Sequence, residues 1–212
     1  MKTPENENQP VVFVIDDDES LRDALKRLFR MVGLRAEAFA AAADFLKMKL
    51  PDVPTCLVLD IRLPGISGLD FQAELARADI KIPIIFMTGH GDIPMTVKAM
   101  KAGAIEFLPK PFRDQDMLDA VQLALERDRT RRQAEQANAQ LRTNFESLSP
   151  REREVMAFVT TGLMNKEVAA QLGLAEVTVK FHRGSLMRKM NARSVAELAR
   201  MAQILGIARP KS

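Results

Sequence analysis

Four short apolar runs without polar alternation constrain the fold of the first half of the chain. They are Val11–Ile15, Cys56–Leu59, Ile82–Met87 and Ala104–Leu108. Strands of a parallel sheet that are buried on both faces have this pattern, whereas half-exposed strands alternate apolar and polar residues. A weaker strand is predicted at Arg35–Phe39.

Amphipathic stretches separate these strands. In the first of them, apolar residues at helical spacing share one face, and Gly33 suits the end of a helix. Later stretches carry Phe71 and Leu75, and then Val97 and Met100. Five repeats of strand and helix predict a doubly wound α/β domain, and right-handed crossovers favour the flavodoxin-like strand order 2-1-3-4-5.

Acidic residues follow two of the predicted strands. Asp16 and Asp17 come after the first strand, and Asp60 ends the third. In the predicted order these strands are neighbours at the topological switch point, so their carboxyl ends share one crevice. Facing carboxylates repel unless a cation neutralises them, and Mg²⁺ suits such a cluster. Because Thr88 ends the fourth strand and Lys110 follows the fifth, the crevice is predicted to be a phosphoryl site.

The charge of the chain is divided unevenly. Residues 1–126 have a net charge of −5, residues 127–147 of +2 and residues 148–212 of +6. This indicates two modules with different partners, of which the basic one is a candidate for binding nucleic acid. The stretch 126–147 lacks Pro and Gly and is rich in Arg, Gln and Ala. It is predicted to be a helical linker, and a solvated spacer is favoured over a coiled coil because sustained heptads are missing.

The basic module is predicted to form four short helices. Segments 149–152 and 194–197 have the pattern of capping boxes. Asn165 is expected to cap the second helix, which ends at Gly173. A helix, a tight glycine turn and a second helix in a small basic domain indicate a helix-turn-helix.

The third helix, about Glu176–Met190, is expected to have a core face and a DNA face. Residues placed 100° apart assign Val179, Leu186, Met187 and Met190 to the core. The opposite face, with its borders, holds Thr178, Lys180, Phe181, Gly184, Ser185 and Arg188. This outer face is expected to enter the major groove.

Individual DNA contacts follow from side-chain chemistry. Lys180 is expected to reach a guanine edge or a phosphate, and Phe181 a thymine methyl group. Thr178 borders this surface. Three further cations are expected to contact phosphates, which position a protein without specifying sequence: Lys166, Arg188 and Arg193.

Three positions of the third helix depart from a simple set of DNA contacts or from the usual helix start. Arg183 borders the core together with His182, so packing and DNA contact are both possible roles. Gly184 either removes a base-reading side chain or lets the backbone approach DNA closely. Ala175 stands where a capping Ser or Thr is common, which costs about 1 kcal/mol of helix-end stability.

The front module resembles a two-component response-regulator receiver domain. The segments VFVIDDDES, LVLDIRLPGISGLD, IIFMTGHGD and AIEFLPKPF carry this resemblance. It implies that Asp60 is the phosphoacceptor for a sensor histidine kinase. It also implies that Mg²⁺ is held by Asp16, Asp17, Asp60 and the backbone carbonyl of Arg62.

The same resemblance assigns a phosphoryl-contacting and switching role to later residues. Thr88 and Lys110 are implied to contact the phosphoryl oxygens, and the Lys110–Pro111 bond is expected to be cis. Thr88 is then expected to move toward the phosphoryl group while Phe107 fills the space that it leaves. Asp18 has no role in the pattern and is interpreted as a loop acid.

The back module resembles a LuxR-type tetrahelical domain through LSPREREVMAFVTTGLMNKEVAAQLGLAEVTVKFHRGSLMRKM. The whole chain is therefore similar to the NarL/FixJ family, nearer the FixJ type. The implied organisation is a receiver at 9–125, a helical linker at 126–147 and a helix-turn-helix domain at 148–212. The implied function is transcriptional regulation, in which phosphorylation drives homodimerisation and binding of double-stranded promoter DNA, with RNA polymerase as a further partner.

Two other classes of function stay open at this point. A crevice with Mg²⁺, Thr and Lys can serve a phosphatase or hydrolase, although no P-loop, GxSxG or catalytic His or Cys pairing is present. We expect no enzyme activity beyond self-phosphoryl transfer and slow loss of the Asp60 adduct. A DNA-binding protein with a vestigial receiver is the other alternative, which the intact acidic and lysine positions disfavour.

The sequence predicts a cytoplasmic protein without membrane contact. No apolar run approaches the roughly 20 residues that cross a bilayer, and the polar N-terminus lacks the apolar core of a signal peptide. The single cysteine, Cys56, excludes an internal disulfide framework and is expected to be buried at a strand start.

Overall fold

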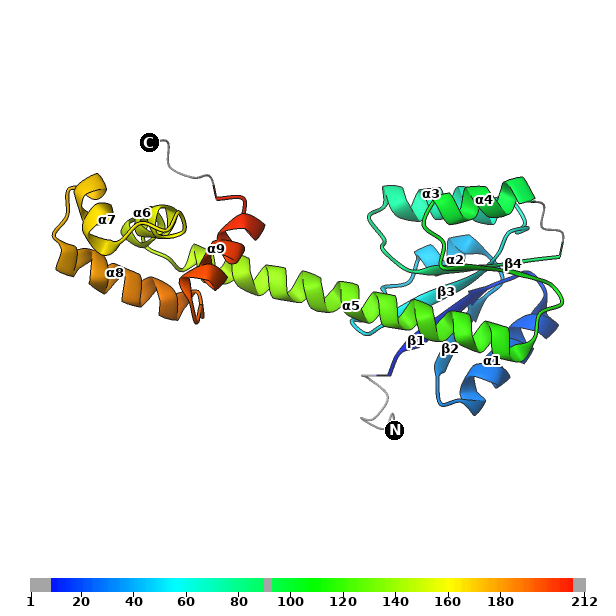
Figure 1. The fold of residues 1–212 in the computed structure, drawn as a ribbon. Coiled ribbons are helices and arrows are strands. Elements are labelled where there is room, and N and C mark those ends of the chain that lie inside the picture. The colour runs from blue at the N-terminus through cyan, green and yellow to red at the C-terminus, as the bar shows by residue number, and fades with distance from the viewer. Residues whose placement is uncertain (1–8, 90–92, 208–212) are drawn as a thin grey trace. The chain divides into compact units, whose positions relative to one another are not determined.

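The computed structural model describes residues 9–89 and 93–207. The chain divides into two compact units, Met1–Arg132 and Gln133–Ser212. The first unit contains a parallel sheet with helices on both faces, and the second is helical (Figure 1). This arrangement confirms the predicted α/β domain followed by a small all-α domain.

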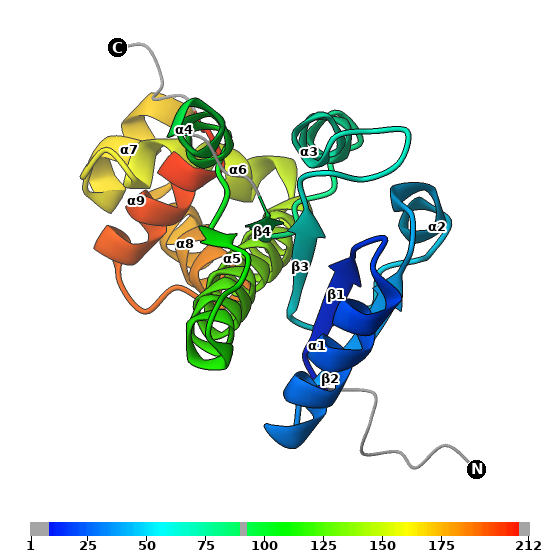
Figure 2. The same ribbon diagram turned by 90° about the vertical axis from the view of Figure 1, so that its right-hand side faces the viewer.

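The sheet of the first unit has the predicted order β2-β1-β3-β4-β5, and every neighbouring pair is parallel (Figure 2). The strands are β1 (Val11–Ile15), β2 (Arg35–Phe39), β3 (Thr55–Asp60), β4 (Ile84–Thr88) and β5 (Glu106–Pro109). The switch point therefore lies between β1 and β3, as the sequence predicts.

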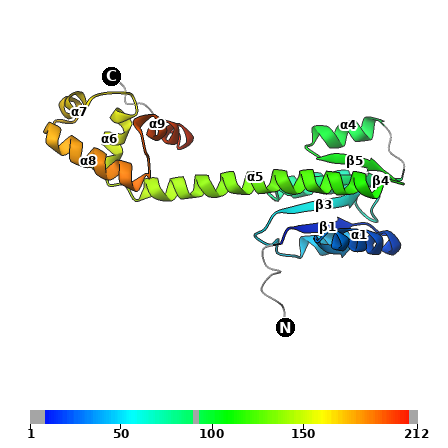
Figure 3. The ribbon, with the colours of Figure 1, turned by 60° about the horizontal axis from the view of Figure 1, so that its bottom comes forward.

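Helices connect these strands and cover the sheet. They are α1 (Glu19–Met31), α2 (Ala42–Leu46), α3 (Gly68–Arg77), α4 (Ile93–Lys101) and α5 (Asp114–Glu146). Figure 3 shows the edge strand β5 beside α4. Asp18 lies in the loop, as interpreted, and also has a structural role: its carboxylate accepts hydrogen bonds from Ser20 N (2.8 Å) and Leu21 N (3.3 Å) and caps α1.

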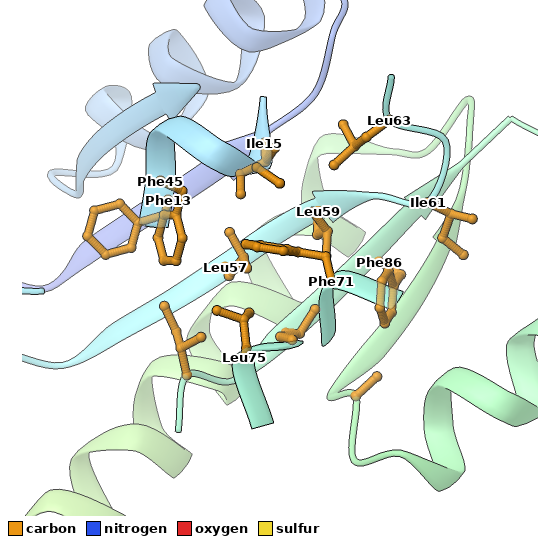
Figure 4. Close-up of a cluster of buried hydrophobic side chains, with 14 of the residues drawn as sticks. Phe13, Ile15, Phe45, Leu57, Leu59, Ile61, Leu63, Phe71, Leu75 and Phe86 are labelled. Atoms are coloured by element: carbon orange, nitrogen blue, oxygen red, sulfur yellow. The ribbon is translucent and has the colours of Figure 1, made fainter. Parts of the chain in front are cut away.

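Strand β1 shows why the apolar runs lack polar alternation. Successive side chains of a strand point to opposite faces, and here both faces are covered. Phe13 and Ile15 belong to a cluster with α2, α3 and α4, part of which is shown in Figure 4. Val12 and Val14 belong to a second cluster with α1 and α5.

Two strands begin later than predicted. The apolar runs include Ile82 and Ala104, whereas β4 begins at Ile84 and β5 at Glu106. Pro83 has no N–H for the ladder, although its carbonyl accepts a hydrogen bond from Leu57 N (2.9 Å). Ile82 and Ala104 are buried outside the strands, so burial extends the apolar pattern beyond the strand itself.

Helix α5 continues from the first unit through the predicted linker. It runs from Asp114 to Glu146, and the boundary between the units follows Arg132 within it. The linker is helical as predicted, and residues 133–140 are exposed as in a solvated spacer, whereas Asp128 and Leu141 nearer its ends are buried. Leu141 belongs to the core of the second unit.

The second unit contains the helices α6 (Pro150–Val159), α7 (Asn165–Leu172), α8 (Glu176–Lys189) and α9 (Val195–Ile204). The box at Ser149 is confirmed: Ser149 Oγ accepts from Glu152 N (3.3 Å), and Glu152 Oε2 accepts from Ser149 N (2.7 Å). At the start of α9, Ser194 Oγ accepts from Glu197 N, but Glu197 Oε2 accepts from Arg193 N instead of Ser194 N. That second box is therefore only half formed.

The predicted cap at Asn165 is wrong. Met164 occupies the N-cap of α7, and Asn165 is already helical. The side-chain oxygen of Asn165 instead accepts a hydrogen bond from Arg183 NH1 of α8 (2.8 Å). Gly173 ends α7 in the left-handed region, at φ 63°, as its position in the sequence predicts.

Candidate functional site

The carboxyl ends of β1 and β3 bring three acidic side chains together. One carboxylate oxygen from each of Asp16, Asp17 and Asp60 lies within 4.8 Å of the others. Asp16 and Asp60 are buried, whereas Asp17 is exposed. The structure thus brings the predicted acids together, and their hard oxygen donors are of the kind that Mg²⁺ takes.

Lys110 lies between two of these carboxylates. Its Nζ donates hydrogen bonds to Asp16 Oδ2 and to Asp60 Oδ2, both at 2.6 Å. The Lys110–Pro111 bond is cis, as expected. Lys110 N donates to Thr88 O (2.6 Å), which attaches this segment to the end of β4.

The remaining carboxylate oxygens are held by backbone groups. Asp60 Oδ1 accepts a hydrogen bond from Arg62 N (2.9 Å), and Asp16 Oδ1 accepts one from Asp18 N (2.9 Å). Each of these two carboxylates is therefore fixed by a backbone N–H on one oxygen and by Lys110 on the other.

Burial and hydrogen bonding act in opposite directions on the pKa values of Asp16 and Lys110. Burial raises the pKa of Asp16, and the hydrogen bonds from Lys110 and Asp18 offset only part of that effect. Burial lowers the pKa of Lys110, but its hydrogen bonds to Asp16 and Asp60 outweigh burial, so its pKa lies above the ordinary value. The ammonium is therefore charged at neutral pH and offsets part of the negative charge that Asp16 and Asp60 bring together.

Arg22 is a site residue that sequence reasoning missed. Its NH1 donates to the carbonyl oxygens of Asp16 (2.8 Å) and Asp17 (2.9 Å). It lies on α1, one turn after the helix start, and fixes the backbone that presents the two acids. An arginine on a helix surface gives no signal in a single sequence that it turns back to the preceding loop.

Close backbone packing also fixes Asp60. A Cβ on Gly68, the first residue of α3, would lie 2.5 Å from Asp60 O and 2.9 Å from Ile61 Cα. Only glycine permits this approach of α3 to the end of β3. Thr88 is fully buried at the end of β4, and Phe107 is half-buried, with its ring centroid 6.4 Å from that of Phe86.

The outer face of α8 is largely as predicted. Lys180, Gly184 and Arg188 are exposed, and 71% of Phe181 is exposed. Val179, Leu186 and Met190 are fully buried, and Met187 packs against them. Val177, 73% exposed, lies one turn before Phe181 and was not predicted to be part of this surface.

Two residues of α8 face the domain rather than solvent. Arg183 is half-buried and bonds Asn165 of α7. Ser185, expected on the outer face, is half-buried and hydrogen-bonds Glu152. Both contacts hold α8 against the helices that precede it. Thr178 is half-buried at the border, and Lys166 of α7 is exposed.

An ion pair between a partly exposed lysine and a buried glutamate joins α8 to the start of α6. Lys189 Nζ donates to Glu152 Oε2 (2.7 Å), and the Glu152 side chain is 5% exposed. Burial alone raises the pKa of Glu152, but the hydrogen bonds from Lys189, Ser185 and Ser149 outweigh burial and set its pKa at about 2. Glu152 is therefore ionised at neutral pH.

Comparison with known proteins identifies the class of protein. The family described as response regulator receiver domain matches residues 12–122, and the luxR family of bacterial regulatory proteins matches residues 146–202. The chain belongs to the two-component response regulators with a LuxR-type DNA-binding domain, and it is a DNA-binding transcriptional regulator.

Particular relatives cover nearly the whole chain. Nodulation protein W of Bradyrhizobium diazoefficiens is 62% identical over 203 residues, which are 96% of this chain and 89% of that protein. Transcriptional regulatory protein FixJ of Azorhizobium caulinodans is 42% identical over 197 residues, 93% of each chain. The solved structure of response regulator StyR has a TM-score of 0.84 at 50% identity and covers 92% of this chain and 98% of its own. Within the described residues, no helix is long and apolar enough to cross a membrane.

The Glu152–Lys189 pair predicts a pH-dependent stability. Lys189→Met leaves a buried carboxylate without its cation, but Lys189 is partly exposed and Ser149 and Ser185 still donate to Glu152. The second unit should therefore lose about 1 kcal/mol of unfolding free energy at neutral pH. The pKa of Glu152 is depressed from 4.5 to about 2 on folding, so its contribution is present above pH 4.5 and is lost as the pH falls toward 2. Urea unfolding followed by circular dichroism should therefore show a smaller difference in unfolding free energy between Lys189→Met and wild type below pH 4.5 than at neutral pH.

Lys180→Met is the matched control, because it removes an exposed cation from the same helix. It should leave stability nearly unchanged at both pH values. A difference between Lys189→Met and wild type that is constant from neutral pH to below pH 4.5 would show that Glu152 is not the responsible group.

Proposed function

We propose that Asp60 accepts a phosphoryl group from a sensor histidine kinase and that this controls DNA binding by the second unit. The observation that carries the proposal is the shared ammonium: Lys110 donates to both Asp16 and Asp60 at 2.6 Å, beside Asp17. A nucleophilic carboxylate, two further acids and a charged lysine together make a phosphoryl-transfer site.

The chemistry requires little more than positioning. An oxygen of Asp60 attacks phosphorus in line, an O–P bond forms, and the P–N bond of the donor phosphohistidine breaks, leaving the electron pair on the imidazole. Lys110 then contacts a phosphoryl oxygen and stabilises the charge that develops there. When bound by Asp16, Asp17, Asp60 and the carbonyl of Arg62, Mg²⁺ supplies further positive charge for the phosphoryl oxygens.

Thr88 and Phe107 are proposed as the switch. Thr88 is buried at the end of β4, one residue beyond the neighbour of Asp60, so it is placed to move toward a phosphoryl group. Phe107 is half-buried on the adjacent strand β5. It has no hydroxyl, so its inward state depends on filling the space that Thr88 leaves.

Phosphorylation is proposed to produce a homodimer. Helix α4 follows β4 and exposes three apolar residues: Ile93 (81%), Val97 (44%) and Met100 (41%). Exposed apolar side chains gathered on one helix favour a protein contact. The dimer is proposed to bind a two-fold related promoter site in the cytoplasm and to act on RNA polymerase.

Phosphoryl transfer can be tested with acetyl phosphate and Mg²⁺. Mass spectrometry should find one added phosphoryl group, on the peptide that contains Asp60, and chelation of Mg²⁺ should prevent its addition. Asp60→Asn should take up none. Lys110→Ala should slow the reaction on the order of 100-fold, because a preorganised positive charge is lost.

Lys98→Ala, which removes an exposed cation from α4, is the control and should react at the wild-type rate. Labelling of Asp60→Asn to the wild-type extent would refute the assignment of the phosphoacceptor. Sustained turnover of a phosphoester by the wild-type protein would instead indicate a phosphatase.

The exposed face of α8 is proposed to read promoter DNA. Base-edge contacts are proposed for Lys180 and Phe181, which are exposed, with Thr178 and Gly184 beside them on the helix. Phosphate contacts are proposed for Lys166 and Arg188, whose side chains are exposed. Arg183 is proposed to act at the DNA surface while bonded to Asn165, which leaves its NH1 partly occupied.

Phe181 predicts a methyl-dependent affinity. The probe is double-stranded DNA selected from a random pool by the protein loaded with beryllofluoride, a stable phosphoryl mimic. Replacing the contacted thymine by deoxyuridine removes one methyl group and should weaken binding about fourfold. In Phe181→Ala the same replacement should have no effect, as measured by fluorescence anisotropy of labelled DNA.

Lys166→Ala serves as the control for this experiment. It should weaken binding to all DNA sequences alike and lower the slope of log affinity against log salt concentration by about one. Its binding should still be sensitive to deoxyuridine. If no thymine position of the selected DNA responds to deoxyuridine in the wild type, Phe181 does not read a methyl group.

A further inference from the structure

Helix α5 carries a carboxylate that is fully buried in a stretch of polar sequence. Asp128 lies in ERDRTRRQ, where the sequence favours a solvated helix, yet it is 0% exposed. It takes no part in the phosphoacceptor site. A charged carboxylate is retained in such a place only when several donors surround it, because burial without partners is unfavourable.

The donors come from the start of β3 and from α5 itself. Asp128 Oδ2 accepts from Thr55 N (2.9 Å) and from Arg132 Nε (2.7 Å). Asp128 Oδ1 accepts from Arg131 NH2 (2.5 Å). Arg132 NH1 continues the chain of contacts to Asp52 Oδ1 (2.9 Å), in the loop before β3.

Thr55 is the residue of the sheet that contacts the cluster formed by Asp128, Arg131 and Arg132. It is the first residue of β3 and is 1% exposed. An N–H group buried at the start of a strand needs an acceptor, and Asp128 provides it across 73 residues of sequence. The negative charge of Asp128 also reaches the next residue of β3, because after burial it is the second cause that raises the pKa of the Cys56 thiol.

The position of β3 gives this contact its significance. The strand begins at Thr55 and ends at Asp60, so one end holds α5 and the other holds the proposed phosphoacceptor. The cluster is also the final attachment of α5 within the first unit, which ends at Arg132. The exposed pair Arg129–Glu126 on the same helix spans only one turn and attaches α5 to nothing else.

We propose that Asp128 is a positioning residue, which fixes the linker helix to the strand that carries Asp60 and so transmits the state of that strand to residues 133–146. The inference rests on the proposed function of Asp60. It adds to that function the contact of Asp128 on α5 with Thr55 on β3.

Hydrogen exchange with mass spectrometry tests this on the full chain, with Mg²⁺ and with or without beryllofluoride. In the wild type, the mimic should slow exchange near Asp60 and change exchange in residues 133–146. In Asp128→Ala, amides at Thr55 and in residues 126–136 should exchange on the order of tenfold faster. The mimic should still protect Asp60, but residues 133–146 should no longer respond.

Glu126→Ala is the matched control, because it removes an exposed carboxylate from the same helix. It should keep the wild-type response of residues 133–146. If Asp128→Ala does not fold, Arg132→Gln is the second variant. It keeps the bond between Asp128 and Thr55 N, but removes the bond from Arg132 Nε to Asp128 and the bridge to Asp52. It should reduce the response of residues 133–146 while leaving Thr55 protected.

The outcomes separate the two proposals. If Asp128→Ala and Arg132→Gln are less stable but keep the response of residues 133–146, Asp128 is merely structural and the inference is overturned. The inference is also overturned if the mimic protects Asp60 in the wild type without any change in residues 133–146. If the mimic fails to protect Asp60 in the wild type, the proposed function fails, and the inference fails with it.

Discussion

The contact of Lys110 with Asp16 and Asp60 is the interaction on which the receiver depends. Three acidic side chains gather where β1 and β3 end, and without a cation they would repel one another. One ammonium offsets two of them at 2.6 Å, and it is delivered by a segment that follows β5. The fold therefore gathers negative charge at the switch point and supplies one lysine that offsets part of it.

The buried charges elsewhere act in the same manner, by joining segments that are distant in sequence. Asp128 joins α5 to β3, and Lys189 joins α8 to α6. Each carboxylate in these pairs is almost fully buried and has several donors. Such groups contribute little through attraction alone, but removing one partner is costly, so they specify one arrangement of helices and strands.

The sequence was sufficient for the fold and for the residues of the crevice, because both follow from short-range patterns. Unalternated apolar runs predicted β1 and β3, and strand order then placed Asp16, Asp60 and Lys110 together. What the sequence could not predict are side-chain contacts that leave no recurring pattern along the chain. Asp128 and Arg22 read as surface residues of helices, and Asn165 as a cap, because their partners are identified only by the three-dimensional structure.

The central claim is that the state of Asp60 governs the assembly that binds DNA. Sedimentation velocity of the full chain with Mg²⁺, with and without beryllofluoride, tests it most directly. The chain has no Trp or Tyr, so sedimentation should be followed by interference optics. A monomer that becomes a dimer with the mimic in the wild type, but not in Asp60→Asn, is the predicted result. An unchanged monomer in the wild type, or an equal dimer in both proteins, would contradict the claim.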